Sequence, residues 1–231
     1  MAGTLYAIAT PLGGAAADAL PAAALKTVRT LQYFVVENAK SARAFLKEVG
    51  MPCAMQELEI SVIETDVSKH VRKLQTDQSI GLLSEAGCPA IADPGAALVE
   101  AAQREGIRVV PLVGPSSIVL ALMASGLEGQ RFAFCGYLPR DAAQRSKKIK
   151  EIEARSRRER ETQIFIETPY RNDVLLGALL EVCTPGTLLC VASDLTLESE
   201  QIKTRKISDW RGSRHAIGKR PTVFLLLSVN R

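Results

Sequence analysis

The chain has 231 residues, a mass of 24.9 kDa and a net charge of +4, with 47% hydrophobic and 23% charged residues. This composition excludes a disordered chain, and the length suffices for one large domain or two small ones. No apolar stretch is long enough to cross a bilayer and the N-terminus lacks the basic region of a signal peptide, so we expect neither membrane insertion nor secretion.

The first half predicts strands that alternate with helices, which is typical of an α/β unit with a mostly parallel sheet. Pro21 suits the first turn of a helix, and Gly106 suits the end of one. The expected strands are Leu5–Ala9, Gln32–Val36, Glu57–Ile63, Ile80–Ser84 and Arg108–Leu112. The expected helices are Pro21–Thr30, Ser41–Val49, Val67–Asp77, Ala96–Glu105 and Ile118–Ser125, with a loop over Pro11–Ala16.

The second half has a different pattern and predicts an α+β domain whose last strands pair antiparallel. We place the domains at 1–117 and 118–231. The expected strands are Phe132–Gly136, Thr162–Glu167, Thr187–Ser193, Glu200–Ile207 and Thr222–Val229, with a turn at Thr168–Arg171 and a helix that ends near Val182.

Two loops between Gly81 and Leu127 are rich in Gly, Pro and Ser, and each follows an apolar strand and opens a helix. In an open parallel sheet, ligands bind at the carboxyl ends of the strands, where helix N-termini present free N–H groups. For one such loop alone, a tight strand-to-helix turn is the favoured explanation. Two in succession favour a ligand site.

Several familiar chemistries have no support in the sequence. It contains neither GxGxxG after the first strand, nor GxxxxGK[ST], nor GxSxG. The two histidines, His70 and His215, lack zinc-ligand spacing, so we expect no metal, and we assign His70 to an exposed helix face. The five cysteines form no CxxC pair, which favours a reducing, cytoplasmic environment.

Positive charge is concentrated in the segment Arg140–Arg160, which holds nine Lys or Arg and four acidic residues, a net charge of +5. One interpretation is a solvated helix on which Lys148, Glu151, Arg155 and Glu159 form intrahelical pairs. The other is a surface that binds RNA or another polyanion through phosphates, because no aromatic residue interrupts the segment. Acidic replacement of arginines in this segment would distinguish the two.

Six motifs in order, LYAIATPLGG, ENAKSAR, GLLSEAGCPAIADPG, VVPLVGPSS, GYLPR and IFIETPYR, carry a resemblance that spans almost the whole chain. The chain resembles the tetrapyrrole-methylase superfamily of S-adenosylmethionine-dependent methyltransferases. Within it, the chain is most similar to the branch that methylates the 2′-O-ribose of a cytidine in small-subunit ribosomal RNA.

The resemblance implies a two-domain α/β fold, usually a homodimer, with S-adenosyl-L-methionine in a cleft between a mostly parallel N-terminal sheet and a mixed C-terminal domain. It implies cofactor contacts from loops in both halves. Carried over by motif, the cofactor-binding residues are Pro11, Asp93, Pro94, Gly95, Leu98, Ser116, Ser117, Ile166, Glu167, Leu195 and Pro221. Each of these also has an interpretation as a turn or cap residue.

Methyl transfer depends mainly on alignment of the acceptor, although a ribose hydroxyl would benefit from a base or a nearby cation. We name four candidates without ranking them: Glu37, Lys40, Arg43 and Arg171. Glu37 is also compatible with a surface ion pair to Lys40 or Arg43. No catalytic residue is assigned.

Departures from the branch pattern concern the acceptor. The chain has Asn38-Ala39-Lys40 where the branch has Asp-Thr-Arg, and Tyr170 where it has His. The branch resemblance and the basic segment Arg140–Arg160 nevertheless favour ribosomal RNA as the substrate. A tetrapyrrole or other small acceptor, and a homologue that binds cofactor or RNA without catalysis, stay open as alternatives.

Overall fold

The computed structural model describes residues 2–212 and 216–229, and the chain divides into two compact units, Met1–Ser116 (unit 1) and Ser117–Arg231 (unit 2). Each unit is described by itself. His215 lies outside the described residues. Within the described ranges, every helix is too short or too polar to span a lipid bilayer.

Unit 1 is built on a sheet with the strand order β3-β2-β4-β1-β5, in which all neighbouring strands are parallel. Every residue of β2 and β4 is buried, as expected of strands that are covered on both faces. The strands are β1 (Leu5–Ile8), β2 (Tyr33–Val36), β3 (Glu59–Val62), β4 (Ile80–Leu83) and β5 (Val109–Pro111).

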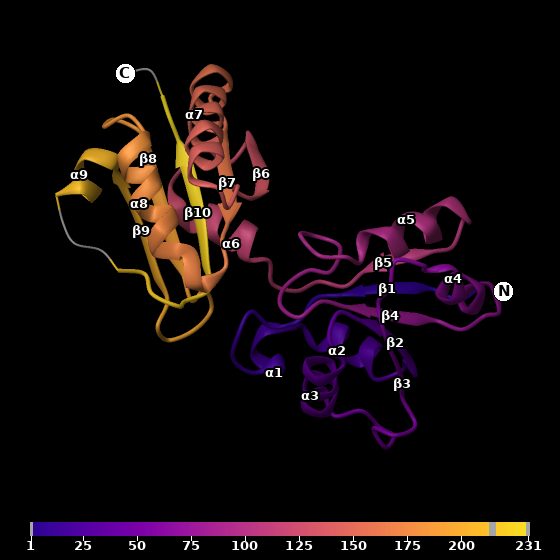
Figure 1. Cartoon of the computed structure of the whole chain (residues 1–231). Helices are drawn as coiled ribbons and strands as arrows, with labels where there is room; N and C mark the ends of the chain where they lie inside the picture. The colour runs from indigo at the N-terminus through magenta and orange to yellow at the C-terminus, as the bar shows by residue number, and fades with distance from the viewer. Residues whose placement is uncertain (1, 213–215, 230–231) are drawn as a thin grey trace. The chain divides into compact units, whose positions relative to one another are not determined.

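Helices cover both faces of this sheet, as Figure 1 shows for α2 and α3 on one side and α4 and α5 on the other. Ile8 and Phe34 pack with the first pair of helices, whereas Leu5 and Val35 pack with the second, because successive side chains of a strand point to opposite faces. The helices are α1 (Ala16–Ala19), α2 (Ala22–Val28), α3 (Ala39–Val49), α4 (Ser68–Gln75) and α5 (Ala96–Arg104).

The start and end of α3 follow from two residues. The Asn38 side chain accepts hydrogen bonds from the backbone N–H groups of Lys40 and Ser41, so the helix begins two residues before the predicted Ser41. Gly50 ends it in the left-handed conformation, with φ of 75°.

The strand order reverses at one point of this sheet, between β4 and β1. From β1 the chain crosses to β2 on one side, and from β4 it crosses over β1 to β5 on the other. The loops after β1 and β4 are joined there by two backbone hydrogen bonds between Thr10 and Gly87, of 2.9 and 3.0 Å. Such a point is the usual ligand-binding position of an open α/β sheet.

Unit 2 has the strand order β6-β7-β10-β8-β9, in which β6 and β7 are parallel and the other neighbours antiparallel. The predicted mixed α+β architecture and the antiparallel pairing of the last strands are therefore confirmed. The strands are β6 (Phe132–Tyr137), β7 (Thr162–Ile166), β8 (Leu188–Ser193), β9 (Gln201–Lys206) and β10 (Thr222–Leu227).

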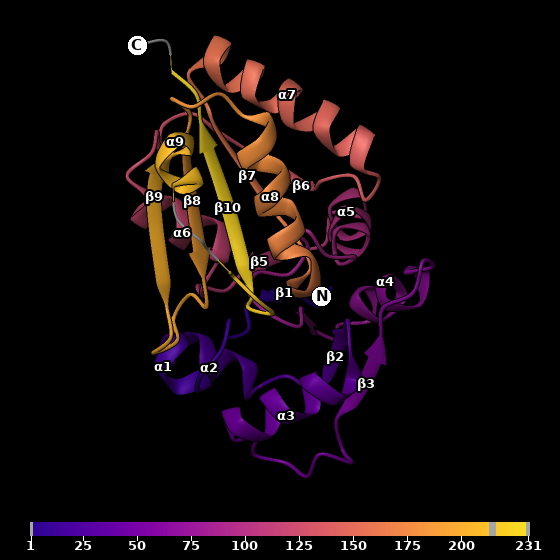
Figure 2. The same cartoon turned by 60° about the vertical axis from the view of Figure 1, so that its left-hand side comes forward.

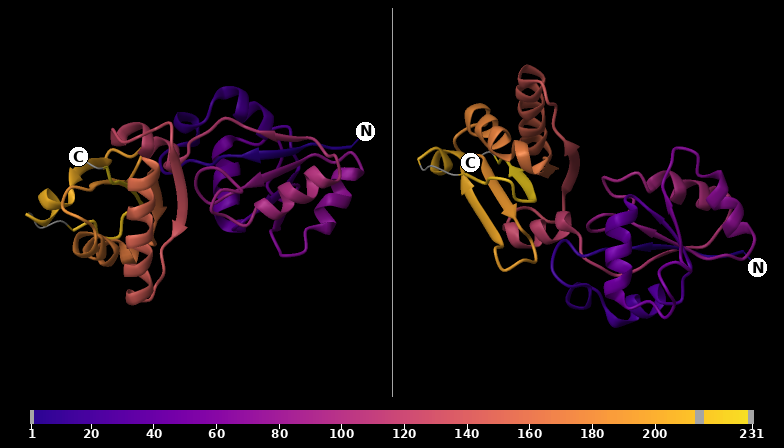
Figure 3. Two further views of the ribbon diagram at one scale, coloured as in Figure 1. Left: turned by 90° about the horizontal axis from the view of Figure 1, so that it is seen from above. Right: turned by 60° about the horizontal axis from the view of Figure 1, so that its bottom comes forward.

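Three helices, α7, α8 and the short α9, pack on one face of the second sheet. There α7 lies beside α8, and α8 beside α9, over a core that includes Phe165 and Phe224 (Figures 2 and 3). The helix α6 packs against β8, β9 and β10 through the buried Ala121. The helices are α6 (Ser117–Ser125), α7 (Ala142–Glu159), α8 (Asn172–Val182), α9 (Ile207–Arg211) and the 3₁₀ turn η1 (Pro169–Arg171).

Two short helices, α1 and α9, were not predicted. Helices this short depend on tertiary contacts, which a sequence pattern does not reveal. In α9, Trp210 is buried and its indole N–H donates to the carbonyl of Leu189 at 2.9 Å.

His70 is buried, so its predicted surface position was wrong. Its side chain is 0% exposed and its Nδ1 lies 2.9 Å from the Tyr33 hydroxyl on β2. The lysines at positions 69 and 73 suggested a polar face, but His70 points inward beside Leu74. Burial, followed by repulsion from Lys69, lowers the pKa of His70 below the ordinary 6.5.

We expect His70 to make the fold sensitive to mild acid. Because its folded pKa is lowered, the unfolded chain binds more protons near pH 6, so the free energy of unfolding falls as pH drops from about 7.5 to 5.5. Urea titrations at several pH values measure this dependence, and H70Q should flatten it. An H70Q variant with the same pH slope as wild type would contradict the assignment.

Candidate functional site

A cavity of about 230 Å³ opens at the carboxyl edge of the unit 1 sheet. It is formed by the loops after β1 and β4 and by residues of α3 from Ser41 to Glu48, beside the point where the strand order reverses. Its lining residues are Thr10, Pro11, Leu12, Gly13, Gly14, Ser41, Ala42, Ala44, Phe45, Glu48, Ser84, Glu85 and Ala86. Of the predicted cofactor residues, Pro11 lies in this lining.

Small residues let the loops of this edge approach closely. Gly87 has a φ of 81°, which side-chain-bearing residues rarely adopt. A β-carbon at Gly114 would overlap the side chain of Ala9, so the loop after β5 lies directly against the end of β1. The Cys88 thiol donates to the carbonyl of Pro115 at 3.4 Å and joins the same loop to the one after β4.

Asp93 organises the loop after β4. Its Oδ1 accepts from the N–H groups of Ala90 and Gly95 at 2.9 and 2.8 Å, while Ala90 and Ala92 adopt left-handed φ angles of 65° and 62°. Its Oδ2 is buried and has no hydrogen-bond donor among the described residues. A strained loop with a buried, unpaired carboxylate oxygen is typical of a ligand site.

The other predicted cofactor residues of unit 1 differ in how far they are exposed to solvent. Pro94 and Gly95 follow Asp93 in its loop. Pro94 is exposed, and Gly95 directly precedes α5. The Leu98 side chain is 0% exposed in the core. Ser116 and Ser117 are half-buried at the end of unit 1 and the start of α6, after the loop that contains Gly114.

The predicted residues of unit 2 meet at one edge of its sheet. Ile166 at the end of β7 pairs with Val223, and Ser193 at the end of β8 pairs with Thr222, so both ends flank the start of β10. Leu195 is buried in the turn after β8, and the Asp194 N–H of that turn donates to the Pro221 carbonyl at 2.9 Å.

Charges at this edge of unit 2 are paired. The Glu167 carboxylate is 1% exposed and lies 3.1 Å from the Arg171 guanidinium. Asp194 lies 2.6 Å from Arg220. Asp194 and Thr196 have left-handed φ angles of 53° and 73°, a second strained segment among the predicted residues.

Glu37 lies near two other carboxylates at the carboxyl edge of the unit 1 sheet. Glu37 is exposed, its Oε2 accepts from the Glu85 N–H at 3.3 Å, and no ion pair joins it to Lys40 or Arg43 among the residues described, so the alternative of a surface ion pair is not observed. Partial burial raises the pKa of Glu37 above 4.5, and the charges of Asp93 and Glu85 raise it further, although the Glu85 N–H opposes this.

Ser41, Ser84 and Glu85 were missed from the sequence. Ser41 Oγ donates to Glu85 Oε1 at 3.2 Å, and Ser84 Oγ donates to the Gly87 carbonyl at 2.7 Å. Ser84 and Glu85 directly follow a buried strand, which is a usable signal. The contribution of Ser41 depends on how α3 packs, which has no sequence signal.

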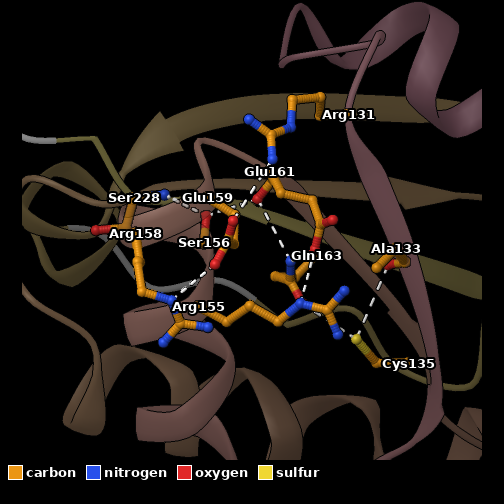
Figure 4. Close-up of polar contacts among 10 residues, drawn as sticks. All are labelled: Arg131, Ala133, Cys135, Arg155, Ser156, Arg158, Glu159, Glu161, Gln163 and Ser228. Atoms are coloured by element: carbon orange, nitrogen blue, oxygen red, sulfur yellow. Dashed lines mark hydrogen bonds and ion pairs between the residues drawn. The ribbon is translucent and has the colours of Figure 1, made fainter.

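The basic segment forms α7, and much of its charge is engaged (Figure 4). Lys148 pairs with Glu151 at 3.6 Å, as predicted. Arg155 pairs instead with Glu161 at 2.9 Å, and Glu159 with Arg158 at 2.7 Å, so that part of the predicted intrahelical pairing was wrong. The reason is the left-handed end of the helix at Arg160, which turns the chain back and brings Glu161 beside Arg155.

Two further arginines of α7 have structural contacts. Arg157 donates to the hydroxyls of Ser228 and Thr184 at 3.2 Å, and the buried Arg145 donates to the carbonyl of Arg140 at 2.9 Å. The exposed cations of the segment without an ion pair among the described residues are Arg140, Lys147, Lys150 and Arg160.

Comparison with known proteins gives consistent matches in sequence. Residues 4–210 match the family described as Tetrapyrrole (Corrin/Porphyrin) Methylases. Ribosomal RNA small subunit methyltransferase I of Pseudomonas aeruginosa is 31% identical over 92% of this chain and 74% of its own length. The protein of the same name from Mesorhizobium japonicum is 34% identical over 87% of this chain, which corresponds to just under two thirds (66%) of its own length.

Two solved structures share the fold. The methyltransferase CobJ superposes with a TM-score of 0.64 at 16% identity, over 98% of this chain and 94% of that one. The uroporphyrin-III-C-methyltransferase from Thermus thermophilus gives a TM-score of 0.57 at 17% identity, over 97% and 94%. At these identities the likeness concerns the fold alone.

Proposed function

The chain is a methyltransferase of the tetrapyrrole (corrin/porphyrin) methylase family, and from that premise we propose that it uses S-adenosyl-L-methionine to methylate ribosomal RNA. The observation that carries the cofactor is the buried Oδ2 of Asp93, which has no donor among the described residues. The substrate is proposed from the relatives named for small-subunit ribosomal RNA and from the free cations of α7.

The loop chemistry fits this cofactor. S-adenosylmethionine supplies an activated methyl group on a positively charged sulfonium and also carries an ammonium group. A buried carboxylate oxygen without a donor is unfavourable, and a cationic ligand group would compensate it. We propose that Asp93 orients the cationic part of the cofactor, with further contacts from Pro11, Pro94, Gly95, Leu98, Ser116, Ser117, Ile166, Glu167, Leu195 and Pro221.

Calorimetric titration with S-adenosylmethionine tests the cofactor assignment. We expect saturable binding by the wild type and a loss of about tenfold or more in D93N, because the variant removes a buried charge that pairs with the ligand. Replacing Ser116 and Ser117 by Leu should abolish binding by filling the loop. E57Q, an exposed carboxylate variant in the same unit, is the control. Absence of binding by the wild type would refute the cofactor assignment.

Among the four acceptor candidates, we propose Glu37 as the general base. It is the one carboxylate among the four, and it is exposed at the carboxyl edge of the unit 1 sheet, where its Oε2 accepts from the Glu85 N–H at 3.3 Å. Its raised pKa adds to its basicity. Arg171 is held by Glu167, and Lys40 and Arg43 are cations that already carry their proton. As a carboxylate, Glu37 would accept the proton of a ribose hydroxyl while the acceptor oxygen is methylated.

The rate of methyl transfer to small ribosomal subunits should therefore fall on the acid side with an apparent pKa above 4.5. E37Q should remove this acid limb and lower the rate by about 10²- to 10⁴-fold, because the amide accepts no proton. E57Q should retain the wild-type profile. A full rate in E37Q would exclude Glu37 as the base.

Charge reversal on α7 tests RNA binding. K147E/K150E should weaken binding of single-stranded RNA and reduce the slope of affinity against salt by about one unit for each lysine lost. K26E/R104E, which changes two exposed cations of α2 and α5, should bind as wild type. R157E is unsuitable because Arg157 also holds Ser228 and Thr184. Unchanged affinity and slope in K147E/K150E would count against α7.

The proposal also includes a cytoplasmic homodimer. Light scattering on the purified protein measures the assembly directly. The mass of a single chain at micromolar concentration would remove the dimer from the proposal.

A further inference from the structure

Tyr170 is an aromatic side chain in an unusually open position. It lies in η1, just beyond the end of β7, and is 78% exposed. Lys219 places its ammonium group 5.0 Å from the centroid of the Tyr170 ring. A ring this exposed does not contribute to the core, so core packing does not explain its position or the cation beside it.

The backbone beneath Tyr170 is held firmly. Pro169 precedes it in the turn, and the Arg171 N–H donates to the Thr168 carbonyl at 2.9 Å. The ion pair between Arg171 and the buried Glu167 holds the turn from the other side. A side chain on such a turn needs little ordering when a ligand arrives.

The loop that carries Lys219 is tied to the same turn. Buried Asn172 donates to the carbonyls of Gly218 and Arg220 at 3.2 and 2.7 Å. Asp173 accepts from the Ile217 N–H at 2.7 Å. These contacts hold the Lys219 loop beside the turn that carries Tyr170, although the two residues are far apart in sequence.

The charges around the ring leave one cation available. Arg171 is neutralised by Glu167, and Arg220 by Asp194. Lys219 is exposed and forms no ion pair within the described part of the chain. An anion that approaches this edge of unit 2 therefore meets Lys219 next to an open aromatic surface.

We propose that Tyr170 and Lys219 form a nucleotide-binding site for the RNA substrate, in which the ring stacks on a nucleobase and the ammonium group contacts the adjacent phosphate. A nucleotide combines an aromatic base with an anion in one unit, which matches this pair. S-adenosylmethionine also has an aromatic base, but it carries no phosphate and a net positive charge, so Lys219 would repel it. The inference rests on the proposed action on RNA.

Titration of a single-stranded RNA oligonucleotide that contains 2-aminopurine tests this site. Fluorescence anisotropy gives the affinity, and quenching of 2-aminopurine reports stacking. Y170A should lower the affinity by about 5- to 150-fold, the effect of losing one stacked base, and reduce the quenching. Y170F should stay within about twofold of wild type because it keeps the ring. K219M should weaken binding and reduce the salt slope by about one unit.

F132A is the matched control, since Phe132 is another exposed aromatic of unit 2 but lies at the opposite end of the β6–β7 pair. Thermal unfolding checks that each variant is folded. Wild-type affinity and quenching in Y170A would overturn the site while leaving the proposed function intact. If Y170A lost affinity for S-adenosylmethionine but bound RNA like the wild type, the ring would belong to the cofactor site and the proposal would also be overturned. Failure of the wild type to bind RNA would instead refute the RNA substrate itself, and the site with it.

Discussion

The parallel pairing of β1 with both β4 and β5 is the constraint on which the N-terminal site depends. Because β1 lies between two strands that come later in the chain, the connections after β1 and β4 leave in opposite directions and their loops open a cavity. The two hydrogen bonds between Thr10 and Gly87 hold these loops together. Pro11 from the first loop and Glu85 from the second therefore line the same cavity.

In the second unit, antiparallel pairing brings the predicted residues together at one edge of the sheet. The strand β10 lies between β7 and β8, so its first residues meet the last residues of both neighbours. The predicted residues Ile166, Leu195 and Pro221, which are far apart in sequence, thereby lie at the same edge of the sheet. Left-handed backbone at Asp194 and Thr196 adds strain there, as Ala90 and Ala92 do in unit 1. Strain of about 1–3 kcal/mol per residue persists only where surrounding structure enforces it, and it is concentrated at ligand sites.

Charge on α7 shows why composition is a weak guide to a binding surface. The segment has a net charge of +5, yet several of its cations pair with carboxylates or hold the C-terminal strand in place. Glu153, a carboxylate of the same helix, is buried and accepts from the Thr184 N–H at 2.8 Å. The cations left free are fewer and lie at particular positions, so the binding surface is defined by pairing rather than by the total charge.

The sequence by itself determined the alternation of strands and helices in the first half, the mixed α+β pattern of the second half, and the family. These features are local: strand and helix periodicity, Gly and Pro in turns, and ordered motifs are all written in neighbouring residues. Only the tertiary structure decided that His70 is buried against Tyr33 and that Arg155 pairs with Glu161. The same holds for the hydrogen bond from Ser41 to Glu85 and for the contact of Lys219 with the Tyr170 ring. Each of these depends on how separate elements pack or on where a helix ends, and short-range patterns carry no information about contacts made across the fold.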